Sequence, residues 1–176
     1  MVIGLKRGTV ELVSYDTCWA KEFEDERRRL LDIFGDKIIA VEHIGSTSIP
    51  GLIAKPIIDI NVAISSLERA EDFILGLQSL GYEYMKGRQF DDRYFFPKGP
   101  ASFRTHHLNL VEYSSETGWN DPLLFKKYLI EHPFSMREYA SLKQHLALEC
   151  KNDRKKYTEA KSDFIKSVII KARNLN

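Results

Sequence analysis

The residues best suited to chemistry lie close together, within positions 41–61, which read VEHIGSTSIPGLIAKPIIDIN. Gly45 has no Cβ, so the oxygens of a ligand can approach its backbone closely. Ser46 and Thr47 follow with hydroxyls and with the N–H groups of an expected helix start, which attract anions. Lys55 adds a positive charge to the same loop. The spacing therefore predicts a loop that holds a phosphate group.

Asp59 and Asn61 follow this loop on the most clearly alternating strand of the chain. Ile58, Ile60 and Val62 share one face of that strand, so Asp59 and Asn61 project from the other. Polar groups within an apolar strand cost free energy unless they are paired, which favours a site over a simple strand-end cap. Proteins hold Mg²⁺ through one or two carboxylates together with phosphate oxygens. Loop and strand together predict metal-assisted nucleotidyl transfer, with Asp59 and Asn61 binding Mg²⁺ or Mn²⁺.

Two side chains outside this stretch are further candidates. His107 shares a strand face with Asn109, and a histidine near an acid can carry out acid–base chemistry. The alternative for His107 is a hydrogen-bonded strand residue. Arg93 has the planar fork that binds two phosphate oxygens at once, so we expect it to reach a phosphate. An ion pair with a neighbouring aspartate is the alternative for Arg93.

The elements that must position these residues alternate between strand and helix patterns. Strands are expected at residues 10–13, 37–44, 57–64, 92–96 and 103–112. Helices are expected from Asp16 or Thr17 to Gly35, over 65–81, from 121 to Pro133, from Ser135 onward, and over 157–172. A mixed sheet covered by helices is the natural arrangement for such elements. The chain is therefore predicted to be an α+β protein with a central mixed sheet and a helical C-terminal third.

The composition limits the class of protein. A chain of 176 residues corresponds to roughly one domain of ~150 residues, so residues 1–176 are expected to form a single domain. Lys and Arg number 26 against 25 Asp and Glu, a balance that disfavours nucleic acid as a partner. Apolar runs stay far below the ~20 residues of a membrane span. With no evident secretion signal and only two distant cysteines, the sequence indicates a cytoplasmic protein.

The central motif GST-x-x-PGL-x-A-KPIIDI resembles the GrpB family, a group with the nucleotidyltransferase fold of DNA polymerase β. The resemblance extends over nearly the whole chain, including residues 11–19, 104–108 and 157–161. It implies that Gly45 and Ser46 lie near a triphosphate and that Asp59 binds a metal. The match over 157–161 also favours Lys161 as a residue that reaches the same pocket.

The chain departs from the superfamily pattern at its acidic residues. The second acid of that pattern falls at Asn61, and no carboxylate lies on the face of the later strand that carries Thr105, His107 and Asn109. Glu42 or Glu112 could supply the missing carboxylate only if the fold of the sheet turns its side chain toward the site. Replacing Asn61 by Asp is therefore expected to strengthen metal binding.

Two functions remain open at this point. The first is a metal-dependent nucleotidyltransferase that moves a nucleotidyl or phosphoryl group from a nucleoside triphosphate to an unknown acceptor. The alternative is a non-catalytic nucleotide- or anion-binding module of the same fold. An RNA-binding role is disfavoured by the balanced charge.

Overall fold

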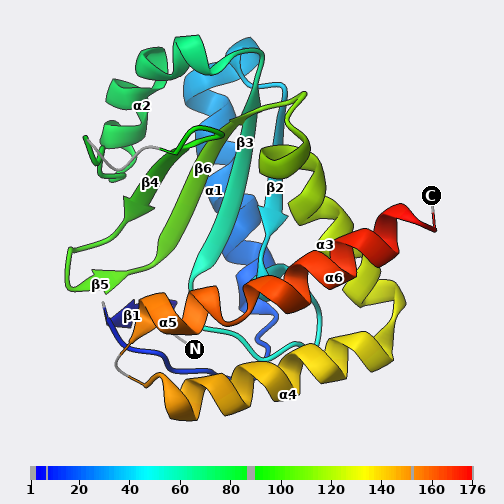
Figure 1. Ribbon diagram of the computed structural model, residues 1–176. Coiled ribbons are helices and arrows are strands. Elements are labelled where there is room, and N and C mark those ends of the chain that lie inside the picture. The colour runs from blue at the N-terminus through cyan, green and yellow to red at the C-terminus, as the bar shows by residue number, and fades with distance from the viewer. Residues whose placement is uncertain (1–2, 7, 87–89, 152, 176) are drawn as a thin grey trace.

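A mixed four-stranded sheet forms the centre of the computed structural model, which describes residues 3–6, 8–86, 90–151 and 153–175 (Figure 1). In spatial order its strands are β2 (Ala40–Ile44), β3 (Ile58–Ile64), β6 (His106–Glu112) and β4 (Tyr94–Lys98). β3 runs parallel to β6, whereas β2 and β4 run antiparallel to their neighbours. A separate two-stranded ribbon pairs β1 (Leu5–Lys6) with β5 (Phe103–Arg104).

The register of this sheet gathers polar side chains from distant parts of the sequence. Asp59 lies opposite His107 on β6 and opposite Ile44 on β2. Two residues further along, Asn61 lies opposite Asn109. Because directly opposed residues project from the same face of a sheet, these side chains share one face.

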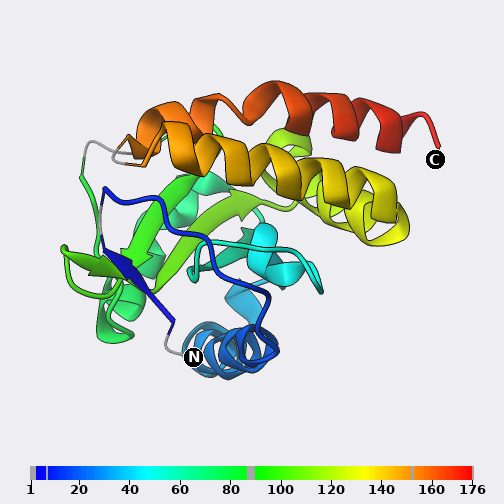
Figure 2. The same cartoon turned by 90° about the horizontal axis from the view of Figure 1, so that it is seen from below.

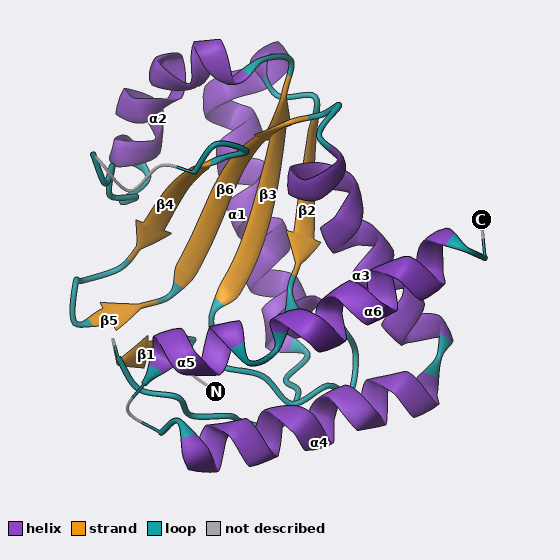
Figure 3. Cartoon of the chain, viewed as in Figure 1, coloured by secondary structure: helices purple, strands orange, loops and turns teal. Residues whose placement is uncertain are grey.

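The other face of the sheet is apolar and packs on α1 (Cys18–Phe34), the 3-10 helix at Leu67–Phe73 and α2 (Ile74–Ser79) (Figure 3). The side chain of Asp16, one residue before the N-cap Thr17, accepts a hydrogen bond from the backbone N–H of Cys18 at 2.9 Å. This layer contains the main hydrophobic core. Its large fully buried members include Trp19, Leu30, Ile58, Ile60, Leu77, Phe96 and Leu108.

The polar face is covered by the C-terminal helices α3 (Asp121–Glu131), α4 (Pro133–Glu149), α5 (Arg154–Glu159) and α6 (Ser162–Arg173). Figure 2 shows α4 and α6 side by side, across the sheet from α1. Tyr139 of α4 and Phe164 of α6 stack with ring centroids 5.1 Å apart, which joins these two helices. Over the described residues, every helix falls short of the length or apolar character that a bilayer crossing requires.

The expected α+β class, with a mixed sheet and a helical C-terminal third, is confirmed. Several boundaries differ. The strand expected at 10–13 is reduced to one bridge between Val13 and Ala54. Pro133 begins α4 instead of only ending α3, because proline lacks the N–H that the first helical position leaves unpaired. The helix expected over 157–172 is divided into α5 and α6.

Candidate functional site

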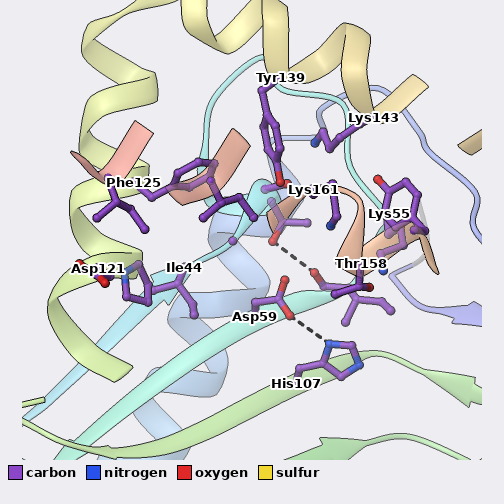
Figure 4. Close-up of a pocket in the computed structure, with 18 of the residues that line it drawn as sticks. Ile44, Lys55, Asp59, His107, Asp121, Phe125, Tyr139, Lys143, Thr158 and Lys161 are labelled. Atoms are coloured by element: carbon purple, nitrogen blue, oxygen red, sulfur yellow. Dashed lines mark hydrogen bonds and ion pairs between the residues drawn. The ribbon is translucent and has the colours of Figure 1, made fainter. Parts of the chain in front are cut away.

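A cavity of about 440 Å³ lies between the polar face of the sheet and the C-terminal helices (Figure 4). The ends of β2, β3 and β6 form one wall, and side chains of α3, α4, α5 and α6 form the other. Most of the residues predicted for the site line this cavity: Gly45, Ser46, Thr47, Lys55, Asp59 and His107. The structure therefore brings the predicted loop and the predicted acid into one hollow.

Asp59 is the carboxylate at the centre of the cavity, and its side chain is 35% exposed. Its Oδ1 accepts a hydrogen bond from Nδ1 of His107 at 3.0 Å, drawn as a dashed line in Figure 4. Burial opposes ionisation of Asp59, but the hydrogen bond from His107 and the nearby charges of Lys55 and Lys161 hold its pKa below the ordinary value. Asp59 is therefore ionised at neutral pH.

His107 joins Asp59 to a residue of the helical layer. Nε2 of its ring lies 3.2 Å from a guanidinium nitrogen of Arg154 on α5. A guanidinium can only donate, so Nε2 accepts from Arg154 and the ring proton resides on Nδ1, from which it is donated to Asp59. His107 is thus held at both ring nitrogens, by groups from β3 and α5.

Gly45 is required by the closeness of Asp59. Its φ of +69° lies in the left-handed region that favours glycine. A methyl group at this position would lie 2.5 Å from Oδ2 of Asp59 and 3.0 Å from its Cβ. The sequence predicted that Gly45 leaves room for a ligand, and the structure shows that it leaves room for the carboxylate of Asp59.

Ser46 and Thr47 of the loop have different environments. Thr47 is buried, and its Oγ1 donates to the carbonyl of Ile57 at 3.2 Å while accepting from Nε2 of His43 at 3.0 Å. These bonds fasten the loop to the start of β3. Burial lowers the pKa of His43 to about 4, which keeps it neutral for this contact. Ser46 is more exposed and shares a side-chain hydrogen bond with Tyr139 of α4.

Four basic side chains gather on one side of the cavity, which we term the cationic end: Lys55, Lys143, Arg154 and Lys161. The ammonium groups of Lys55 and Lys161 both lie over the ring of Tyr157, at 5.2 Å and 4.5 Å from its centroid. The buried Lys143 donates to the carbonyl of Ile53. Figure 4 shows the three lysines on the same side of Asp59.

Burial and mutual repulsion make the positive charges of the cationic end electrostatically unfavourable. Burial lowers the pKa of Lys55 and of Lys143 to about 7, and that of Lys161 to about 8. Neighbouring positive charges of the same cluster lower each pKa further. A ligand with several negative charges would relieve both effects, so the cluster suits a polyanion.

The opposite side of the cavity, termed the apolar end, is lined by Ile44 and Phe125, by Pro122 next to Asp121, and by Ile165 and Ile169 of α6, which pack in the same cluster as Phe125. The charged side chain on this side is Asp121, whose Oδ1 accepts from Arg173 at 2.6 Å. In Figure 4 the labels of Ile44, Asp121 and Phe125 lie across Asp59 from the lysines. The cavity is therefore polarised from end to end.

Two predicted site residues do not line this cavity. Asn61 is buried one row further along the sheet, where its Nδ2 donates to the carbonyl of Gly118 at 2.7 Å and its Oδ1 accepts from Asn109 at 3.0 Å. Arg93 lies against Asp92, at 3.2 Å, and over the ring of Phe90, at 4.3 Å from its centroid. The ion pair weighed for Arg93 is thus the contact present.

The donors do not fit a resident pair of metal ions. Across the described ranges, no three His, Cys, Asp or Glu side chains are grouped to hold an ion. Glu42 lies 3.9 Å from Lys126, and Glu112 accepts from the backbone N–H of Leu67, so neither carboxylate joins Asp59. One carboxylate beside a cationic cluster fits a magnesium ion that enters already bound to phosphates.

No role was assigned to Lys143 or to Arg154 from the sequence. Both residues line the cavity from the helical layer. No local spacing pattern marks them, because each is brought to the site by the packing of a helix on a segment far away in sequence: Lys143 donates to the carbonyl of Ile53, and Arg154 to His107.

Comparison with known proteins assigns the chain to a protein family. A model described as "GrpB protein" matches residues 9–171. The UPF0157 protein YqkA of Bacillus subtilis (strain 168) is 38% identical over 158 residues, which cover 90% of this chain and 46% of that relative. The chain thus spans about half the length of YqkA.

Solved structures agree with this relationship. The crystal structure of conserved protein GrpB from Enterococcus faecalis superposes with a TM-score of 0.84 at 34% identity, covering 92% of this chain and 96% of that one. The Cid1 poly(U) polymerase with MgGTP bound gives a TM-score of 0.52 at 18% identity, covering 76% and 44%. That second likeness shows a shared nucleotidyltransferase-like fold.

Proposed function

Because the chain belongs to the GrpB family, and because of the geometry of the cavity, we propose that it binds a nucleoside triphosphate and transfers its nucleotidyl group to an acceptor. The observation that carries the proposal is the cationic end, four basic side chains grouped beside one ionised carboxylate, Asp59. The negative charges of a triphosphate would balance the positive charges of these four side chains. The Cid1 structure holds MgGTP on the same fold, which supports a magnesium nucleotide as the ligand.

The proposal gives each residue a role. Lys55, Arg154 and Lys161 neutralise the phosphates and the charge that develops on the leaving group. The carboxylate of Asp59 holds the magnesium ion of the nucleotide, and that ion supplies further neutralisation of phosphate charge. His107 fixes the orientation of Asp59 through its Nδ1–H bond. Gly45 keeps the space in which the carboxylate lies.

One observation favours a second candidate, a module that binds the nucleotide without turning it over. The second acid of the superfamily pattern is replaced by Asn61, and both ends of its amide are bonded within the protein. The protein therefore supplies one carboxylate, whereas ordinary two-metal transfer uses metal charge on both the attacking and the leaving oxygen.

Calorimetry with ATP, GTP, CTP and UTP in Mg²⁺ or Mn²⁺ tests the binding step. We expect metal-dependent binding that is weakened at least tenfold in Asp59→Asn and unchanged in Asp36→Asn, which removes an exposed acid instead. Release of labelled pyrophosphate from a nucleotide labelled at the γ-phosphate then separates the two candidates. Turnover that is lost in Asp59→Asn supports the transferase, and tight binding without turnover supports the binding module. No binding of any of the four nucleotides rejects both.

A further inference from the structure

We infer that the cavity is divided into a phosphate subsite at the cationic end and a nucleobase subsite at the apolar end, where Asp121 favours guanine. This inference rests on the proposed function, since it takes the ligand to be a nucleotide. It goes further by fixing the direction in which the nucleotide lies and the base that it carries.

The direction follows from the polarity of the cavity. The cationic end holds four basic side chains, whereas the apolar end has five apolar lining residues and one carboxylate, Asp121, which is paired with Arg173. Burying a phosphate among Phe125, Ile165 and Ile169 would cost free energy, because nothing there compensates its charge. A planar base gains from the same surroundings, since aromatic and aliphatic side chains stabilise it by stacking and burial.

Asp59 lies between the two ends and completes the order of the subsites. A nucleoside triphosphate has its α-phosphate between the base-bearing sugar and the terminal phosphates. With the terminal phosphates at the cationic end and the base at the apolar end, the α-phosphate lies beside Asp59. This is the phosphate at which nucleotidyl transfer takes place, so the inferred direction agrees with the proposed reaction.

Asp121 gives the apolar end a preference among bases. Its side chain lines the cavity and is 17% exposed, and the ion pair with Arg173 holds it in place as a carboxylate. An ionised carboxylate only accepts hydrogen bonds. The Watson–Crick edge of guanine presents two adjacent donors, N1–H and the N2 amino group. The Watson–Crick edges of adenine and uracil place an acceptor beside their donor. Because a carboxylate cannot donate to that acceptor, it binds these bases less well than guanine.

Inorganic tripolyphosphate separates the two subsites experimentally, because it carries the charge of the nucleotide without a base. We would measure its affinity and that of Mg·GTP by calorimetry in Ile169→Trp, which fills the apolar end. The matched control is Ile170→Trp, at the next position of α6, where the side chain is exposed. We expect Ile169→Trp to weaken GTP at least tenfold and to leave tripolyphosphate unchanged. Equal losses for both ligands, or no loss for GTP, would overturn the division into subsites.

The base preference is tested with Asp121→Asn. We expect GTP to bind about tenfold more tightly than ATP or UTP in the native protein, and this preference to disappear in the variant. Arg173→Met removes the ion pair but keeps the carboxylate, so it should retain the preference. A native protein that does not favour GTP, or a variant that weakens all nucleotides equally, would overturn the role of Asp121.

The same measurements separate failure of this inference from failure of the proposed function. Absence of binding by every nucleotide rejects the proposed function and with it the inference. Binding of nucleotides with an affinity equal to that of tripolyphosphate leaves the proposed function intact but rejects the nucleobase subsite.

Discussion

Replacing Gly45 by Ala is the most direct test of how the site is built. Gly45 has a φ of +69°, and its methyl group would lie 2.5 Å from Oδ2 of Asp59. Gly51 provides a matched control, since it has a φ of +80° and no atom within 4 Å of the added methyl group. Both variants place a side chain on a backbone with positive φ, which costs about 1–3 kcal/mol. Only Gly45→Ala also forces Asp59 to move.

The extra cost follows from the contact that Asp59 loses. A hydrogen bond to a charged group contributes about 1.5–3 kcal/mol, and the bond from His107 to Asp59 is of this kind. Asp59 is about one-third exposed, so we expect a difference near 1.5 kcal/mol between the two variants. For a chain of this size, 1 kcal/mol changes the Tm by about 2–4 °C. Gly45→Ala should therefore melt about 3–6 °C below Gly51→Ala.

Urea and thermal denaturation of both variants measure this difference, and calorimetry with tripolyphosphate and Mg·GTP measures the site. We expect Gly45→Ala to lose metal-dependent nucleotide binding and Gly51→Ala to keep it. If the two variants have the same stability and bind the nucleotide equally well, then Asp59 does not depend on the space at Gly45, and our account of the loop is wrong.

Three further predictions concern charge. Between pH 7 and pH 10 the free energy of unfolding, measured by urea denaturation, should rise. The reason is that Lys55, Lys143 and Lys161 lose their protons near pH 7–8 in the folded protein but near their ordinary pKa in the unfolded chain. A free energy of unfolding that does not change over this pH range would contradict the burial of these lysines. Over the same range the affinity for tripolyphosphate, measured by calorimetry, should fall at least tenfold as these ammonium groups become neutral, and a constant affinity would show that they do not bind it. Asn61→Asp should destabilise the fold by about 2–4 kcal/mol at pH 7, because it replaces the donor to the Gly118 carbonyl by a buried charge, and it should not tighten Mn²⁺ binding. Unchanged stability together with tighter Mn²⁺ binding in that variant would show that residue 61 faces the metal site after all.

The predictable part of the site is the part that is local in sequence. Gly45, Lys55 and Asp59 belong to one loop and the strand that follows it, so their spacing alone indicated a common hollow. His107 was reachable by sequence reasoning because strand alternation fixes the face of a residue. The partner strand of β3, and hence the pair of Asp59 with His107, is decided by tertiary pairing that no local pattern encodes.

The remaining residues were not predictable for the same reason. Arg154 lies in a basic run whose other members Lys155 and Lys156 are exposed, and only the packing of α5 turns it toward His107. The expectation for Asn61 depended on a site that extends along β3. Trp119 and the turn at Gly118 instead close over that part of the sheet. The single-domain organisation stays a prediction.

The sheet and the C-terminal helices contribute different charges to the site. The sheet provides the carboxylate, whereas α4, α5 and the residue before α6 provide Lys143, Arg154 and Lys161. A molecule bound in the cavity therefore contacts both layers and stabilises the packing of the C-terminal helices on the sheet. At one hundred times its dissociation constant, such a ligand adds about 2.7 kcal/mol to the free energy of unfolding. The loaded protein should resist partial detachment of its C-terminal helices far better than the empty one.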